Sequence, residues 1–218
     1  MTEAQPVAEN PTDSRPHTQP LNVVVLASGF GSLLQSMLDT LDSSKVRIVA
    51  VGSDKECRAL QRAKELNIPT FMVPFDEEAK KDRAGWDERF LRAVVKHDPD
   101  IVVSAGFMRI LGETFVAHFA DRIINTHPAL LPSFPGAHAV PDALAYGVKV
   151  TGTTVHIVDT GVDTGPILAQ RSVPVEDDDT VESLHERIKV VERRLLVDVL
   201  HSISDRGIVR DGRKAYLK

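Results

Sequence analysis

The sequence predicts an α/β fold in which a doubly wound, mostly parallel sheet is flanked by helices. Apolar, β-branched runs recur at residues 22–26, 46–52, 68–73 and 101–105, and helical patterns separate them. A glycine-rich turn at 27–32 directly follows the first run. Strands that alternate with helices of this length are typical of parallel sheets, and a glycine turn between strand and helix is typical of Rossmann-like folds.

Local signals support each element of the first half. Apolar residues from Leu33 to Leu41 recur at helical spacing after the glycine turn. Residues 53–56 resemble a capping box for a second helix, whose apolar face carries Leu60, Ala63 and Leu66. A helix over 82–97 then leads into the run at 101–105. Right-handed crossovers would place the glycine turn and the end of that run at one edge of the sheet.

The second half continues with shorter elements. A short helix over 112–119 precedes a strand that ends at Asn125, and two further strands are predicted at 152–158 and 167–175. Asp179, with Glu182 three residues later, starts the last long helix. Its apolar stripe consists of Val181, Leu184, Ile188, Val191, Leu195 and Val199. The polar stretch 207–218 is expected to be peripheral.

Composition limits the classes of function. The 218 residues are 42% hydrophobic, enough for one sizeable core, and a net charge of −5 gives no basic field for nucleic acid. Cys57 is the single cysteine, which excludes an internal disulfide, and we expect it to be a small filler at a helix start. No signal-peptide core and no run of 18 apolar residues is present. We therefore expect a cytoplasmic protein that binds neither nucleic acid nor membrane.

The chain is expected to fold as a single domain over residues 21–218. Residues 1–20 contain four prolines and few large apolar residues, so they predict a disordered tail. Residues 203–218 form a peripheral C-terminal tail in this prediction.

The stretch 123–136 combines polar side chains with proline. Asn125 and His127 follow an apolar run, and three prolines and Gly136 come after them. Proline fixes φ and lacks an N–H, so the segment past His127 predicts a stiff loop at a strand end. Asn125 and His127 alternate along the chain and would project to one side there, where α/β proteins bind ligands. A surface loop in which His127 only bonds to the backbone is the alternative.

The glycine loop from Ser28 to Ser32 predicts an anion site. Its backbone N–H groups and the positive end of the following helix favour a phosphate. A dinucleotide has less support, because Leu34 replaces the third glycine of G-x-G-x-x-G. Asp54 lies near the spacing expected for a ribose contact, but we interpret it as part of the helix cap. A tight turn without a ligand is the structural alternative.

Asn125, His127 and Asp163 form a second candidate site, because each lies at a strand end or in the loop beyond one. An amide and an imidazolium donate to an oxygen that gains negative charge, and a carboxylate favours the charged imidazole. This set suits acyl transfer. No serine occupies a nucleophile elbow, so the attacking group is expected to come from the second substrate. A metal site built from His127, His138, His156 and Asp163 is the competing prediction, but these residues lack the spacing of a helical ligand pair.

Four ordered motifs, at 26–34, 105–111, 125–136 and 152–166, resemble the phosphoribosylglycinamide formyltransferase family of purine synthesis. The resemblance extends from residue 22 to residue 200. It implies a Rossmann-like formyltransferase fold and transfer of a formyl group from 10-formyltetrahydrofolate to the amine of glycinamide ribonucleotide. Both substrates are small molecules, no metal is implied, and a homodimer stays open.

The resemblance also implies roles for individual residues. Asn125 and His127 would stabilise the oxyanion of the tetrahedral intermediate, and Asp163 would raise the pKa of the imidazole and help to move a proton through water. Supporting residues are Pro128, Thr154 and His156. Residues 21–105 would be the phosphate-binding half, and the ribonucleotide would contact Gly29, Phe30, Gly31, Ser32, Leu33, Lys189 and Glu192. Residues 106–202 would be the folate-binding and catalytic half, and the folate would contact Arg83, Met108, Arg109, Ile110, Leu111, Val158, Asp159, Thr160, Gly161, Val162 and Asp163.

The glycine loop departs from the family pattern. Phe30 and Leu33 stand where the family usually has asparagine, so we expect the backbone alone to bind phosphate, with Lys189 as a substitute charge. Three alternatives remain. Formyltetrahydrofolate hydrolase normally adds an N-terminal regulatory domain, and methionyl-tRNA formyltransferase adds a C-terminal nucleic-acid-binding domain. The third is a phosphosugar-binding module without turnover.

Overall fold

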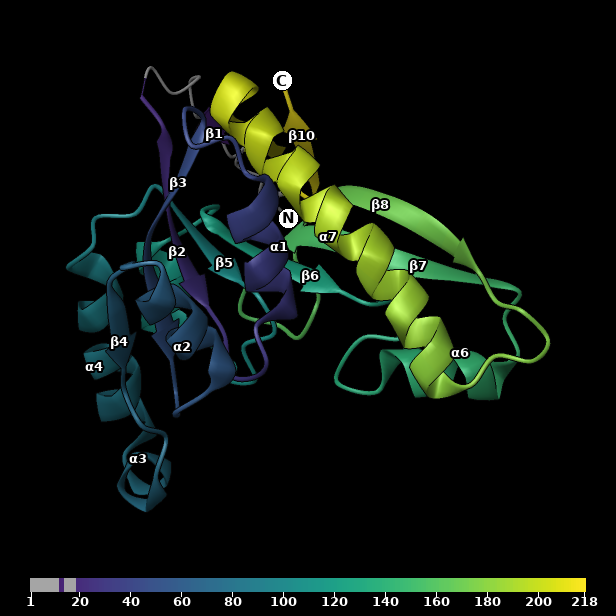
Figure 1. Ribbon diagram of the computed structural model, residues 1–218, viewed down its shortest axis with the longest axis horizontal. Coiled ribbons are helices and arrows are strands. Elements are labelled where there is room, and N and C mark those ends of the chain that lie inside the picture. Colours follow the sequence, from purple (N-terminus) through teal and green to yellow (C-terminus); the bar gives the residue numbers. More distant parts are fainter. Residues whose placement is uncertain (1–11, 14–18) are drawn as a thin grey trace, which may run out of the picture.

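Seven strands form a central sheet in the order β4-β3-β2-β5-β6-β7-β8 (Figure 1). The computed structural model describes residues 12–13 and 19–218. Strands β2 to β6 pair in parallel, whereas β7 and β8 are antiparallel to their neighbours. The predicted mostly parallel α/β fold is therefore confirmed. The strands are β2 (Leu21–Leu26), β3 (Val46–Ser53), β4 (Thr70–Met72), β5 (Ile101–Ser104), β6 (Ile123–His127), β7 (Val150–Ile157) and β8 (Ile167–Pro174).

Helices cover both faces of the sheet, because β2 alternates between two apolar clusters. Val23 and Val25 face one cluster, and Val24 and Leu26 face the other. The first cluster includes α1 (Ser32–Thr40), α2 (Arg58–Glu65) and α7 (Val181–Arg206). The second includes α3 (Glu77–Lys81), α4 (Arg83–Val95) and α5 (Glu113–His118). A short helix, α6 (Ala139–Tyr146), packs with α7 through a third small cluster.

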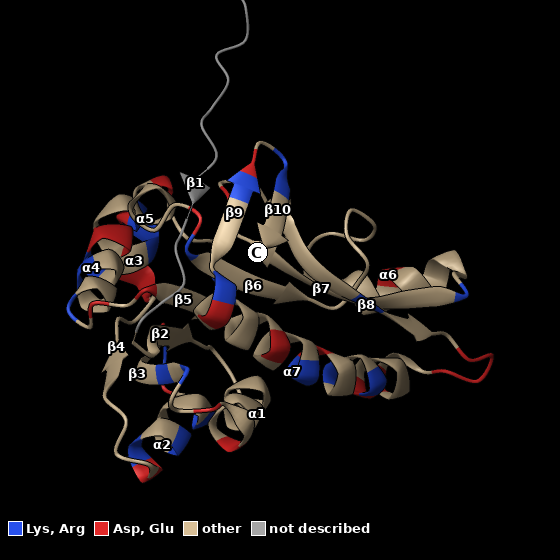
Figure 2. Ribbon diagram, turned by 90° about the horizontal axis from the view of Figure 1, so that it is seen from above, with Lys and Arg blue, Asp and Glu red and all other residues tan. Residues whose placement is uncertain are grey.

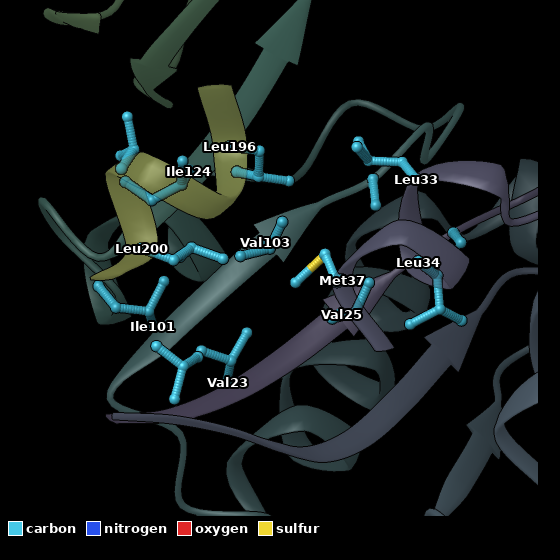
Figure 3. Close-up of a cluster of buried hydrophobic side chains, with 14 of the residues drawn as sticks. Val23, Val25, Leu33, Leu34, Met37, Ile101, Val103, Ile124, Leu196 and Leu200 are labelled. Carbon is cyan, nitrogen blue, oxygen red and sulfur yellow. The ribbon is translucent and has the colours of Figure 1, made fainter. Parts of the chain in front are cut away.

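Helix α7 joins the two halves of the molecule. Figure 3 shows Leu196 and Leu200 of α7 beside Ile101 and Val103 of β5, with Met37 of α1 nearby. Lys, Arg, Asp and Glu gather on the helices and loops, whereas the central strands carry few of them (Figure 2). Within the described residues, no helix has both the length and the apolar character needed to cross a membrane.

The strand register sets the position of the candidate residues. Leu26 pairs with Ser104, and Ser104 pairs with Asn125. The carboxyl ends of β2, β5 and β6 therefore lie side by side at one edge of the sheet. The segments that follow these three strands, including the glycine loop and the loop after His127, start from this common edge.

Two predicted helix starts are wrong. The capping box at 53–56 does not form, because Ser53 ends β3 and α2 begins at Arg58. Cys57 occupies the N-cap of α2, at the helix start that was expected for it. Helix α7 is capped by Thr180 and Ser183, whose side chains and backbone N–H groups exchange hydrogen bonds, instead of by Asp179 and Glu182.

The C-terminal stretch is more ordered than its polarity indicated. It forms a hairpin of β9 (Ile208–Asp211) and β10 (Lys214–Leu217), and Ile208 is buried in the first cluster. The predicted tail, residues 1–20, lies mostly outside the described residues. Residues Thr12–Asp13 of this segment are described, and they form strand β1, which pairs antiparallel with β9. The prediction of a disordered tail is therefore wrong for these two residues. Helices α3 and α6 were not predicted.

Candidate active site

A cavity of about 610 Å³ lies at the carboxyl edge of the sheet. Its lining comes from segments far apart in the sequence: 28–33 after β2, 104–111 after β5, 125–128 on β6, and parts of 156–163 after β7. Helix α7 adds His185, Lys189 and Glu192. The shared strand edge therefore produces one cavity that contains both sites predicted from the sequence.

The structure brings Asn125, His127 and Asp163 together. The Asp163 Oδ2 atom lies 3.2 Å from His127 Nδ1, and Asn125 Nδ2 donates to Oδ1 at 3.5 Å. The backbone N–H of Gly136 also donates to Oδ2, at 2.8 Å. Asp163 has a φ of 53°, a conformation that residues other than glycine rarely adopt. These contacts aim one carboxylate at an amide and an imidazole that lie on one side of β6.

His156 orients the Asn125 amide. Its Nδ1 atom lies 3.0 Å from the carbonyl oxygen of Ile157, which can only accept, so Nδ1 carries a proton. In the neutral ring Nε2 is then an acceptor, and the Asn125 Nδ2 atom lies 3.1 Å from it. The buried ring thus fixes which end of the amide is the donor.

Both ring nitrogens of His127 face acceptors. Besides Asp163 at Nδ1, the carbonyl oxygen of Phe134 lies 2.8 Å from Nε2. A doubly protonated ring would satisfy both contacts. Burial nevertheless lowers the pKa of His127 below its ordinary value of 6.5 and outweighs the opposing effects of Asp163 and the Phe134 carbonyl. Asp163 raises the pKa of His127, as the resemblance implied, but the net pKa lies below the ordinary value because burial has the larger effect.

Asp163 is held as a carboxylate. The His156 ring, whose Nε2 atom lies 3.5 Å from Oδ1, is the largest cause that lowers its pKa, and the Gly136 N–H and the nearby His127 act in the same direction. Burial opposes them, yet the pKa falls from 3.8 to about 2. The group is therefore charged throughout the neutral pH range.

The glycine loop wraps the start of α1. Gly31 is the N-cap residue with a φ of 72°, and a Cβ there would lie 2.8 Å from the Cα of Ala59. No side chain caps this helix end, and residues 28–33 line the cavity. Arg62 of α2 contacts the loop at Phe30. Its Nε donates to the Phe30 carbonyl at 3.1 Å, and its guanidinium lies 5.3 Å from the centre of the Phe30 ring. The exposed end of α1 can receive an anion.

Three side chains of α7 face this loop across the cavity. His185, Lys189 and Glu192 follow at spacings of four and three residues, so they share one face of the helix. Lys189 is bound to Glu186 at 2.7 Å. Burial raises the pKa of Glu192, and a hydrogen bond with the Thr126 hydroxyl opposes that rise. The two predicted residues, Lys189 and Glu192, thus lie where the sequence placed them.

The segment 108–111, which we call the 108–111 wall, forms another part of the cavity lining. Met108 and Ile110 are 68% and 64% exposed, whereas Leu111 is 8% exposed. Val162, in the loop after β7, adds another exposed apolar side chain. The guanidinium of Arg109 turns away to the carboxylate of Asp54. This surface can contact a flat, largely apolar group.

Three of the predicted site residues lie outside the cavity lining. Arg83, the first residue of α4, donates to the Ile110 carbonyl and to Asp87, so it contacts the 108–111 wall from behind. Thr154 is buried, where it donates to the Ala129 carbonyl at 2.7 Å and accepts from the Leu131 N–H at 3.0 Å. It thereby holds the loop that follows His127. Thr160 lies in the loop after β7.

Sequence reasoning missed several residues of the site. His185 precedes Lys189 by one helical turn, a spacing that was readable once α7 was placed. Asp54 was interpreted as a helix cap, and it is instead a buried partner of Ser28 and Arg109. Ser28 was predicted only as the start of the glycine loop, and Thr126 had no local signal. Among the described residues, no group of three or more His, Cys, Asp or Glu side chains has an arrangement that could hold a metal ion.

Comparisons with known proteins show which family the chain resembles. Residues 21–200 match the family model described as formyl transferase. The chain is 56% identical, over 92% of its length and 93% of the relative, to a phosphoribosylglycinamide formyltransferase from Mycobacterium tuberculosis. A glycinamide ribonucleotide transformylase from Symbiobacterium toebii superposes with a TM-score of 0.85 at 35% identity, over 92% of this chain and 95% of that one.

A second type of enzyme is also similar. A formyltetrahydrofolate deformylase from Pseudomonas syringae superposes with a TM-score of 0.82 at 31% identity, over 92% of this chain and 66% of the other. All three relatives carry names that refer to formyl groups or their transfer. On the family match and these identities, the chain belongs to the formyl transferase family.

Proposed function

We propose that this protein is a phosphoribosylglycinamide formyltransferase, which moves the formyl group of 10-formyltetrahydrofolate to the amine of N1-(5-phospho-D-ribosyl)glycinamide. The observation that carries the proposal is the convergence of Asn125, His127 and Asp163 on a cavity that also contains the exposed start of α1. The M. tuberculosis relative with 56% identity carries the name of this activity. The reaction needs a site for each of two small molecules, and the cavity offers two different surfaces.

The ribonucleotide is assigned to the side formed by the glycine loop and α7. Its phosphate would bind the N–H groups at the start of α1, with Lys189 as the lysine that α7 contributes to the cavity lining. Glu192 would accept from the ribose hydroxyls. Within one domain from residue 21 onward, residues 21–105 would supply the phosphate loop, and residues 106–202 would supply the folate site, the catalytic residues and the α7 contacts to the ribonucleotide.

The formyl donor is assigned to the side formed by the 108–111 wall and the loop from Val158 to Asp163. Met108, Ile110 and Val162 would contact the pterin ring, because they expose apolar side chains at the cavity. Arg83 would remain behind the wall, near the tail of the folate. This places the formyl group between the two surfaces, beside Asn125 and His127.

Asn125 and His127 would stabilise negative charge on the formyl oxygen. His156 orients the amide nitrogen, which would exchange its long contact with Asp163 for the formyl oxygen as that charge develops. His127 would reach the same oxygen by exchanging its contact with the Phe134 carbonyl. Developing charge on the oxygen would offset the burial that lowers the pKa of His127, so that the charged ring forms when it is needed.

Asp163 would balance charge and help to move a proton. The amine attacks the formyl carbon directly and must lose a proton, while the leaving nitrogen of the folate must gain one. A carboxylate with a pKa of about 2 stays charged, so it stabilises an imidazolium and orients a water that relays the proton. No covalent enzyme intermediate is needed.

A formyltetrahydrofolate hydrolase is the second candidate. The Pseudomonas syringae deformylase shares the fold at 31% identity, and water in place of the amine would use the same three residues. The glycine loop and α7 favour the transferase, because hydrolysis needs no site for a phosphate. A phosphosugar-binding module without turnover would leave the cluster around Asp163 without a purpose.

The proposed function is tested by a formyl-transfer assay with the purified protein. The absorbance change of the folate is followed with 10-formyltetrahydrofolate alone and with added ribonucleotide. We expect turnover that depends on the ribonucleotide. Turnover at the same rate without it would establish the hydrolase instead, and no turnover under either condition would contradict both enzymes.

The catalytic roles predict that His127→Ala and Asp163→Asn each lower kcat by about 10², because each removes stabilisation of the developing charge. The Kd for the ribonucleotide should change by less than about threefold, since its phosphate and ribose bind elsewhere. Steady-state kinetics and calorimetric titration measure the two quantities. His118→Ala is the matched control, because His118 is exposed on α5 away from the cavity. Equal losses in kcat and in ribonucleotide affinity would contradict the assigned roles.

Asp163 should also make stability depend on pH. A folded pKa of about 2, below the ordinary 3.8, gives stabilisation that is present above pH 4 and is lost as the pH falls through about 2. We expect Asp163→Asn to lower the free energy of unfolding by about 2 kcal/mol at pH 7, and the difference to shrink between pH 4 and pH 2. Urea titrations over this range test it. Asp178→Asn, an exposed change in the loop before α7, should show no such convergence.

Two glycines of the phosphate loop should respond differently to alanine. Gly31 has a positive φ and its Cβ would meet the backbone of Ala59, so Gly31→Ala must shift the loop. Around Gly29 a Cβ meets nothing within 4 Å. Gly31→Ala should raise the Kd for the ribonucleotide at least about tenfold, given a strain of about 1–3 kcal/mol, and Gly29→Ala much less. Similar affinities for both variants would argue against phosphate binding by this loop.

A further inference from the structure

Asp54 is a buried carboxylate that the catalytic scheme does not use. It follows β3 and lies behind the cavity lining, with its side chain 1% exposed. Each of its oxygen atoms has one strong partner: the Ser28 hydroxyl donates to Oδ1 at 2.6 Å, and Arg109 Nε donates to Oδ2 at 2.8 Å. A buried charge with both oxygens bonded fixes the groups that bond to it.

The two partners of Asp54 belong to two adjoining segments of the cavity lining. Ser28 starts the glycine loop, and Arg109 lies in the 108–111 wall. The Ser28 oxygen also accepts a hydrogen bond from the backbone N–H of Met108 at 3.0 Å. Asp54 is thus linked to the wall in two ways. It bonds directly to the Arg109 side chain, and it bonds to Ser28, which in turn accepts from the Met108 backbone.

Aromatic packing completes the attachment of the wall. The Arg109 guanidinium lies 4.5 Å from the centre of the Phe75 ring, and Arg83 lies 5.1 Å from the same ring. Arg83 also donates to the Ile110 carbonyl. Backbone and charged groups are therefore held at the back of the wall, which leaves the side chains of Met108 and Ile110 exposed at the cavity.

We propose that Asp54 is a positioning residue for the formyl donor: it sets the 108–111 wall against the glycine loop, so that folate affinity depends on a carboxylate that does not touch the folate. The inference rests on the proposed folate site. It extends that site to a residue outside the cavity lining, and it makes Arg109, which lines the cavity, the link between Asp54 and the wall. Phe75 and Arg83 keep this link in place.

An isosteric change tests the role without removing volume. Asp54→Asn keeps the shape but loses the charge, and an NH2 group, which cannot accept, replaces one of the two oxygens to which Ser28 and Arg109 donate. Arg109→Met removes the link from the other end. The double variant shows whether the two act through each other, because coupled residues are not additive.

The measurements are the Kd for tetrahydrofolate and for the ribonucleotide by calorimetry, kcat and both KM values, and Tm. We expect Asp54→Asn and Arg109→Met each to raise the folate Kd and KM about tenfold, with kcat and the ribonucleotide Kd within about twofold. The double variant should be no weaker than the poorer single one. Asp121→Asn is the control, since this carboxylate pairs with Arg210 at 2.8 Å away from the cavity, and it should lower Tm without changing the folate Kd.

Two outcomes would overturn the proposal. One is an unchanged folate Kd in Asp54→Asn. The other is a rise in both ligand Kd values that follows the loss of Tm, which is the result of a merely structural ion pair. The wild-type protein, measured in the same experiment, distinguishes failure of the Asp54 proposal from failure of the proposed function. If the wild type transfers the formyl group and the variant has an unchanged folate Kd, only the role of Asp54 is overturned. If the wild type shows no ribonucleotide-dependent transfer, the proposed function is overturned.

Discussion

The carboxylate of Asp163 is the contact on which the arrangement of the active site depends. It accepts from Asn125 and from the Gly136 N–H, and it lies beside His127 and His156. Gly136 belongs to the loop after β6, whereas Asp163 belongs to the loop after β7. One charged group therefore joins two loops and two strands. Its positive φ shows that the local backbone adopts an unfavourable conformation to place it there, a cost that its several hydrogen bonds offset.

Burial and charge oppose each other around His127. The ring has acceptors at both nitrogens, which favours the charged form, yet its enclosure favours the neutral one. A group balanced in this way responds strongly to a new charge nearby. That property suits a residue that must stabilise an oxygen only while negative charge is present, because the same ring would otherwise hold a costly buried cation in the resting protein.

Patterns local in sequence predicted the fold well, and contacts between distant residues were harder to predict. The mostly parallel sheet follows from the alternation of apolar runs and helices, and the convergence of Asn125, His127 and Asp163 followed from strand ends and family resemblance. The misplaced cap at 53–56 shows the limit. Asp54 matches a helix-capping pattern within its own segment, and only the fold reveals Ser28 and Arg109, 26 and 55 residues away, as its partners. The net lowering of the His127 pKa was not predicted for a related reason, since burial by distant segments has no local signal in the sequence.

Helix α7 fixes the position of three cavity-lining side chains relative to the main core. Its C-terminal half is locked in the main core by Leu195, Leu196 and Leu200, while His185, Lys189 and Glu192 on its N-terminal half face the cavity. Each residue turns an α-helix by about 100°. One residue inserted between Glu192 and Leu195 would rotate the cavity-facing side chains by that angle while the core held the other end in place. The number of residues between Glu192 and Leu195 therefore defines the site as strictly as the identity of the side chains does.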